Sequence, residues 1–171
     1  AVGSSDSDAS DAESLRGESR DGDRFGSSRV RANAALCVAS LARANPRSLH
    51  AHWSKLLPTS PGQLLPRSPT ATTLRLVVAD PSPRVRAAAA AAIAQMLEGN
   101  ATRQYLAAAE VRVHPKTGLV IRRNFASLSS TLGDVAVTLH AALTRAAVAE
   151  PSLSCVPAAC KALAAFLDAA P

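Results

Sequence analysis

The chain has 171 residues and a formal net charge of +6; 47% of the residues are apolar, only 3% are aromatic and 37 are alanine. Three Phe, one Trp and one Tyr are too few for a β-sandwich or barrel, whereas alanine is the strongest helix former, so the composition predicts an all-α protein. No apolar run approaches the roughly 18 to 20 residues that span a bilayer, so we expect no membrane partner. One domain is expected at this length.

The first 27 residues differ from the rest of the chain in composition. They are rich in Ser, Gly and acidic residues, and residues 1–23 hold seven acids against two arginines. Such a segment has too little apolar surface to offset its ordering entropy, so we expect a disordered arm over residues 1–27. Ser5 and Ser10 each precede an acid by three residues, the pattern that acidophilic kinases prefer, and are predicted phosphorylation sites. The alternative is that any tail rich in Ser and Asp contains such triplets.

Residues 28–171 are expected to form one helical domain. A first amphipathic helix is predicted from Ser28 to Asn45, and its apolar positions have three- and four-residue spacing. These positions are Val30, Ala34, Cys37 and Leu41. The spacing continues after Pro46, which predicts a second helix that stops at Pro58 and has inward positions at Leu49, Trp53 and Leu56. Residues 59–69 are rich in proline and are predicted to be a linker.

A helical hairpin is predicted next in the chain. Its first helix runs from about Thr70 to Ala79, with inward positions at Leu74, Val77 and Val78. Its second helix follows the Asp80-Pro81-Ser82-Pro83 turn and ends at Gly99-Asn100, a common C-terminal stop. The inward positions of this second helix are Val85, Ala88, Ala89, Ala92, Ile93, Met96 and Leu97. A shorter helix is expected over Thr102–Glu110, and residues 111–124 are interpreted as an inserted loop or small β-hairpin.

Two further helices complete the predicted domain. The first runs from about Ser127 to Glu150, with inward positions at Leu128, Leu132, Val135, Leu139, Ala142 and Ala146. The closing helix has Ser154 as a predicted N-cap and inward positions at Leu153, Val156, Cys160, Leu163 and Leu167. Antiparallel helix pairs joined by short turns that contain proline fit either an irregular bundle or an α-solenoid.

One motif favours the solenoid. The stretch from Leu74 to Ala89 resembles the turn and second-helix start of a HEAT repeat. In that motif Asp80 is expected to cap the second helix, Pro83 to fix φ in its first turn, and Val85 to enter the core. Arg86 is the position that in HEAT repeats reaches toward the aspartate of a neighbouring repeat. We therefore predict helix pairs stacked as a HEAT-like α-α superhelix, the alternative being an ordinary Asp-Pro helix start.

Short motifs along almost the whole chain resemble one family. In chain order these are Asp6 to Glu13, Arg31 to Cys37, His52-Trp53-Ser54, Leu56-Leu57-Pro58, Asp80-Pro81-Ser82-Pro83, Leu97-Glu98-Gly99 and Ala149-Glu150. Together they resemble the domain of unknown function in HEAT-repeat-containing protein six and its relatives. The resemblance implies an α-superhelical scaffold with no assigned enzymatic activity, and it brings no catalytic residues.

The residues themselves nominate no catalytic, cofactor or metal site. The four histidines are far in sequence from the cysteines, and the chain has no metal-binding motif, glycine-rich phosphate loop or paired carboxylates. Cys155 and Cys160 are predicted to be small core residues. Three cysteines in helical segments favour a reducing compartment, so we expect an intracellular protein, cytoplasmic or nuclear. We expect no enzymatic activity, no cofactor and no small-molecule substrate.

Positive charge is the remaining functional signal. After residue 23, seventeen Arg and Lys residues accompany six acids, and the densest cluster lies in the predicted insert at Arg112, Lys116, Arg122 and Arg123. These four are the predicted binding residues. The leading hypothesis is a protein–protein interaction scaffold, a segment of a larger HEAT-repeat protein. The alternatives are solvated helix faces without a ligand, or binding of nucleic acid or an acidic partner through the basic helical surface.

Overall fold

The structure is a computed structural model that describes residues 27–58, 72–110 and 127–170. These residues form eight helices and contain no strand, which confirms the all-α prediction for them. The helices are α1 (Ser28–Ala44), α2 (Pro46–His50), α3 (Trp53–Leu56), α4 (Thr73–Ala79), α5 (Pro83–Leu97), α6 (Asn100–Leu106), α7 (Leu128–Ala149) and α8 (Val156–Ala169). The predicted arm apart from Ser27, the linker 59–69 and the insert 111–124 lie outside the described residues.

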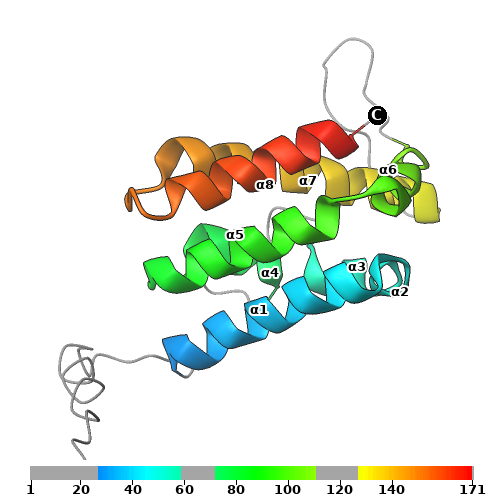
Figure 1. The fold of residues 1–171 in the computed structure, drawn as a ribbon. Helices are drawn as coiled ribbons and strands as arrows, with labels where there is room; N and C mark the ends of the chain where they lie inside the picture. The colour runs from blue at the N-terminus through cyan, green and yellow to red at the C-terminus, as the bar shows by residue number, and fades with distance from the viewer. Residues whose placement is uncertain (1–26, 59–71, 111–126, 171) are drawn as a thin grey trace, which may run out of the picture.

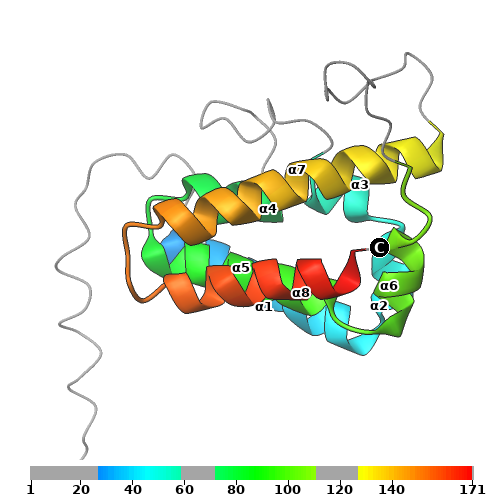
Figure 2. The same ribbon diagram turned by 90° about the horizontal axis from the view of Figure 1, so that it is seen from above.

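Five of the helices form two layers. In the first layer α1, α5 and α8 lie side by side, with α5 in the middle (Figure 1). The second layer contains α4, which packs on α5, and α7, which packs on α8 and on α4 (Figure 2). The short helices α2 and α6 pack on each other at one end of the layers.

The central helix α5 has the predicted inward face. Val85, Ala89, Ala92 and Met96 are all buried, as are Ile93 and Leu97, while Ala88 is partly buried. The helix is covered by α1, α4 and α8 together. Its run of alanines allows this because small side chains let helix axes approach closely on several sides.

The first predicted helix forms, but its predicted inward face is wrong. Val30 and Leu41 are 66% and 58% exposed, and Ala34 and Cys37 are exposed as well. The helix instead packs on α5 through a second stripe, which consists of Ala32, Ala35, Ala39 and Ala42. Both stripes have helical spacing, but the alanine stripe permits the closer approach to the alanine-rich surface of α5.

The closing helix α8 shows the same correction. Leu153, Cys160 and Leu167 are exposed, and Val156 and Leu163 are only half-buried. The buried face consists of Cys155, Ala159, Ala162, Phe166 and Ala169. The predicted cap is also wrong, because Cys155 is the N-cap residue and makes no side-chain cap bond. Alanine positions again decide which side of the helix packs.

The long helix α7 follows the prediction closely. Ser127 caps it, with its hydroxyl accepting from Ser130 N at 3.2 Å, and all predicted inward residues are buried except Leu128. Contrary to the expectation of no such run, α7 is long and apolar enough to cross a membrane by length and composition. Its buried face packs against α4 and α8, which is the arrangement of a core helix.

The shorter helices differ from prediction at their ends. The helix predicted from Pro46 to Pro58 is interrupted at Ala51 and His52, so that α2 and α3 are separate. The side chain of Asn45 caps α2 by accepting from Ser48 N at 3.2 Å. The predicted stop after α5 is confirmed, because Gly99 has φ 95°, a conformation that favours glycine. The next helix, α6, starts and ends earlier than predicted.

Candidate interaction surface

Two arginine–carboxylate pairs connect successive parts of the fold. Arg31 on α1 donates through Nε and Nη2 to the carboxylate of Asp80 at 2.8 and 3.2 Å. Arg86 on α5 donates through Nη2 and Nε to the carboxylate of Glu150 at 2.7 and 3.1 Å. Each arginine is the fourth residue of its helix, and all four side chains are largely buried. Bidentate pairs of this kind fix the orientation of both partners.

The two carboxylates belong to turns of the same design. Asp80 and Glu150 each follow a second-layer helix and are each followed by Pro and Ser. Asp80 Oδ1 accepts from Ser82 N at 2.9 Å, and Glu150 Oε1 accepts from Ser152 N at 3.0 Å. The acid therefore holds its own turn and binds the arginine of the preceding first-layer helix.

The residues of the predicted HEAT turn have related but different roles. Pro83 is the first residue of α5, and Val85 is fully buried. Asp80 does not cap α5, because Ser82 is the N-cap residue and the bond from Asp80 stays within the turn. Arg86 reaches a carboxylate of the next turn, but that carboxylate belongs to a glutamate rather than an aspartate.

The Arg86 guanidinium also anchors its own turn. Its Nη1 donates to the carbonyl oxygens of Asp80 and Pro81 at 2.8 and 3.1 Å. Hydrogen bonds from Arg86 lower the pKa of Glu150, against the opposing effect of burial, and the bond to Glu150 raises the pKa of Arg86. The pair therefore stays ionised in the folded state and links α5 to the α7–α8 turn.

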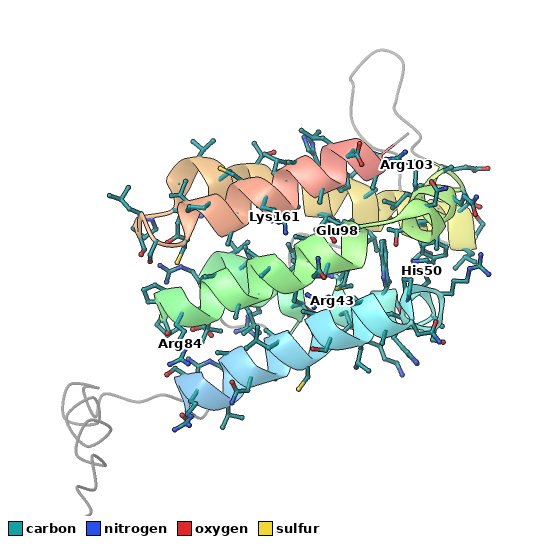
Figure 3. The ribbon with its side chains drawn as sticks, viewed as in Figure 1. Arg43, His50, Arg84, Glu98, Arg103 and Lys161 are labelled. Atoms are coloured by element: carbon teal, nitrogen blue, oxygen red, sulfur yellow. The ribbon has the colours of Figure 1, made fainter. Side chains whose placement is uncertain are left out.

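A chain of polar contacts crosses the outer side of the first layer, where Figure 3 labels Arg43, Glu98 and Lys161. Arg43 on α1 donates to Gln95 on α5 at 2.9 Å, and Gln95 donates to Glu98 at 2.6 Å. Lys161 on α8 lies 3.6 Å from Glu98. These groups are mostly solvent-exposed, so they contribute little to stability and define a polar, mixed-charge surface.

An aromatic cluster joins α2 and α3 to α6. The His50 ring stacks on Tyr105 with centroids 4.4 Å apart and meets the edge of the buried Trp53 at 5.4 Å. Thr102 donates its only hydroxyl hydrogen to Met96 O, so the 3.2 Å contact requires His50 Nε2 to donate to Thr102. Burial and the nearby Arg47 lower the pKa of His50. Sequence reasoning placed Trp53 in the core but did not foresee the other two rings.

Large exposed apolar side chains gather at the two outer helices of the first layer and at the ends of α7. Those on α1 are Val30, Leu36 and Leu41; those on or just before α8 are Leu153 and Leu167; those on α7 are Leu128 and Val148. The free thiols of the outer helices α1 and α8 are also exposed, in contrast to the thiol that precedes α8. Cys37 and Cys160 are exposed, so Cys160 is not the core residue predicted, whereas Cys155 is buried and its Sγ donates to Pro83 O at 3.0 Å.

The chain matches the family described as "Domain of unknown function (DUF4042)" over residues 29–171, a range that includes nearly all the described residues. The chain belongs to this family. No solved structure matches it. The two-layer helical fold is thus the structure of a DUF4042 domain, and its function must be argued from its surface.

Hollows lie at the surface of the described part of this DUF4042 domain. One of about 350 Å³ is mainly apolar and lies among α6, α7 and α8, where His140 stacks on Phe166 with centroids 5.7 Å apart. Another, of about 220 Å³, lies between the C-terminal ends of α4 and α7 beside the Arg86–Glu150 pair and Arg145. Within the described ranges, no group of three His, Cys, Asp or Glu is placed to hold a metal ion.

Several residues predicted to be functional lie outside the described part of the DUF4042 domain. They are the binding residues Arg112, Lys116, Arg122 and Arg123 and the phosphorylation sites Ser5 and Ser10. The charges that the structure does describe are eleven Arg and Lys residues against six acids. The described surface is therefore basic without the predicted insert.

Proposed function

We propose that this DUF4042 domain is a non-enzymatic protein-interaction scaffold, built as a HEAT-like stack of helix pairs. The observation that carries the proposal is the repetition of one contact between neighbouring units. In both cases the fourth residue of a first-layer helix is an arginine bound by the acid of the next acid-Pro-Ser turn. In a solenoid each repeat contacts only its neighbours, so the same contact recurs from repeat to repeat.

The sequence register of the first-layer helices supports the same proposal. When α1 and α5 are aligned on Arg31 and Arg86, four apolar positions coincide: Val30 with Val85, Ala34 with Ala89, Cys37 with Ala92, and Leu41 with Met96. When α5 and α8 are aligned on their acid-Pro-Ser turns, those positions coincide with Cys155, Ala159, Ala162 and Phe166. This agreement favours three copies of one unit, as the resemblance to HEAT-repeat-containing protein six implies.

The physics of such stacks supports a scaffold role. Stacked helix pairs form an extended surface whose exposed residues are not required for the core, so the surface is available for partners. Here that surface carries exposed apolar side chains on α1 and α8 and an excess of positive charge. The three free cysteines are compatible with an intracellular location, in the cytoplasm or nucleus.

The proposal is tested with the tagged full chain expressed in cells and captured at two salt concentrations. We expect specific proteins to be enriched over an unrelated helical protein of similar net charge, and to remain bound at the higher salt. Enrichment of no protein above that control would contradict the scaffold proposal.

A second candidate function is binding of nucleic acid through the basic surface. Five exposed basic residues make no ion pair within the described part of the chain: Arg29, Arg47, Lys55, Arg84 and Arg145. Arg29 and Arg84 lie in the first turns of α1 and α5, which begin at the same end of the first layer (Figure 1). Phosphate contacts release counterions, so affinity for duplex DNA or single-stranded RNA is expected to fall steeply between about 50 and 200 mM salt. Fluorescence anisotropy measures this, and no binding at the lower salt would eliminate the candidate.

A further inference from the structure

One helix of the first layer has an apolar stripe that the structure does not cover. The outer stripe of α1 consists of Val30, Ala34, Cys37 and Leu41, all exposed. The residues at the same register in α5 are Val85, Ala89, Ala92 and Met96, each no more than 1% exposed. The residues at that register in α8 are buried as well. The stripe is thus a core position in two helices and a surface position in the third.

Apolar helices cover this register wherever it is buried. The helices that pack on α5 include α1, α4 and α8, and those that pack on α8 include α5 and α7, and each of them has buried apolar residues. Within the described residues α1 packs on α5 and α2, and no second-layer helix packs along it. The comparison of α1 with α5 and α8 therefore indicates that a helix with an apolar face fits the outer stripe.

The charges of α1 define the chemistry of that helix further. The seventeen residues of α1 include three arginines and no acid. Asp80 neutralises Arg31 and Arg43 reaches across to Gln95 on α5, so among the residues that the structure describes the free positive charge beside the outer stripe is Arg29, next to Val30. A partner that approaches this side of α1 meets uncompensated positive charge, so acidic side chains along the flank of its apolar face are favoured.

We propose that the outer stripe of α1 is a docking surface for an amphipathic helix of another protein, apolar on one face and acidic along its flank. The proposal rests on the proposed scaffold function and names the surface and the partner chemistry. Val30 and Leu41 are the apolar anchors, and Arg29 selects the acidic flank. Recognition of this kind, a helix laid on an apolar stripe, uses partner residues at three- and four-residue spacing.

Two other occupants fit the surface less well. The acidic residues 1–26 of the same chain complement its charge, but their large apolar residues Val2, Leu15 and Phe25 do not have helical three- and four-residue spacing. A second copy that pairs α1 with α1 brings together two helices that contain arginines and no acid, so like charges oppose association. Both occupants are distinguishable in the experiment below.

The test uses the full chain and a defined probe. The probe is a fluorescein-labelled 16-residue helical peptide with leucines at three- and four-residue spacing and glutamates on the flank; the matched peptide has lysines in place of the glutamates. We expect the acidic peptide to bind and the basic peptide to bind at least about tenfold more weakly, as measured by fluorescence anisotropy. The V30S/L41S double variant is expected to lose at least about tenfold in affinity.

Matched controls locate the binding surface. The L153S/L167S double variant removes comparably exposed side chains from the opposite side of the first layer, and is expected to bind the peptide normally. All four residues are exposed, so circular dichroism is expected to show unchanged helix content in both variants. The peptide is also expected to protect the exposed Cys37 thiol from iodoacetamide and to leave the exposed Cys160 thiol reactive.

Several outcomes overturn the proposal. Equal binding of the two peptides refutes the acidic flank, and loss of binding in L153S/L167S alone refutes the surface. Binding that appears only after deletion of residues 1–26 identifies those residues as the occupant. A dimer in sedimentation equilibrium that V30S/L41S dissociates identifies a second copy as the occupant. A cellular partner that V30S/L41S still captures refutes this docking surface but leaves the scaffold function intact, whereas no captured partner refutes the scaffold function itself.

Discussion

Helices α1 and α5 carry the same register of apolar residues and have opposite surroundings. Met96 on α5 is buried, and Leu41 at the same register on α1 is 58% exposed. The difference does not come from the residues, since both are large and apolar. It comes from the number of neighbours, because α5 is covered on several sides and α1 packs on α5 along its other face. The same side chain type therefore stabilises the fold in one helix and is free to bind in the other.

The largest expected effect separates a buried ion pair from an exposed one. Arg86→Ala leaves the buried carboxylate of Glu150 without its partner and is expected to cost about 3–5 kcal/mol of unfolding free energy. Arg103→Ala breaks the equally short 2.6 Å contact to Asp168, but both side chains are exposed, so the cost is expected to be below about 1 kcal/mol. Urea unfolding followed by circular dichroism measures both. Equal costs would contradict the role assigned to burial.

The next effect compares the two helices at one register. Met96→Ala is expected to destabilise the fold by about 2–5 kcal/mol, because it removes buried surface and leaves a cavity. Leu41→Ala is expected to change the unfolding free energy by less than about 0.5 kcal/mol, because the side chain is largely in solvent. The urea midpoints of the two variants test this. A destabilisation of the same size in Leu41→Ala would show that the outer stripe is covered within the chain itself.

A third effect distinguishes the buried His50 from the exposed His52. Folding lowers the pKa of His50 below 6.5, so below that pH the unfolded chain binds more protons than the folded chain. The contribution of His50 to the unfolding free energy is therefore expected to be fully present above about pH 6.5. The unfolding free energy is expected to fall as the pH drops below that value. His50→Gln keeps a donor for Thr102 and is expected to flatten the change between pH 7 and pH 5. His52→Gln is the matched control and is expected to retain the wild-type pH dependence.

The smallest expected difference in stability is between two variants that enlarge an alanine at the same register of α5 and α1. Ala89→Leu places three more carbon atoms in the packed core and is expected to cost about 1–3 kcal/mol. Ala34→Leu at the same register on α1 is expected to change stability by less than about 0.5 kcal/mol. Thermal melts compare the two variants. Ala34→Leu is further expected to keep binding of the acidic peptide, because it enlarges the apolar stripe.

The comparison of α1 with α5 also explains why the predicted inward faces of α1 and α8 were wrong. Hydrophobic periodicity identified an apolar stripe on each of the two helices, and both segments are helical, so each stripe lies along one side of its helix. On α5 the stripe is buried, but on α1 a different stripe of alanines packs, because periodicity reports a face and not the neighbour that covers it. The closing helix α8 repeats the error, since Leu167 is exposed and Leu163 is only half-buried. Its buried residues are Ala159, Ala162, Phe166 and Ala169.

Residues that start or stop a helix were predicted more reliably than the faces that the helices bury. The proline at the start of α5 and the glycine after it act within a few residues, and both were predicted. The serine that caps α7 also acts locally, but it was not predicted as a cap. The contacts of Arg31 with Asp80, of Arg86 with Glu150 and of His50 with Tyr105 join residues far apart in the chain. The resemblance to a HEAT repeat indicated that Arg86 reaches an aspartate of a neighbouring unit, but its partner is a glutamate. The sequence could not identify Glu150 as that partner, because the choice depends on how the helices stack.

The sequence by itself determined the helical class, the helix start at Pro83 and the helix stop at Gly99, because alanine content, proline and glycine act within one or two turns of chain. The tertiary structure alone decided which face of α1 is exposed, which acid binds each arginine and where apolar surface remains for a partner. The physical reason is that burial belongs to a side chain together with its neighbours, and those neighbours are set by packing between distant helices.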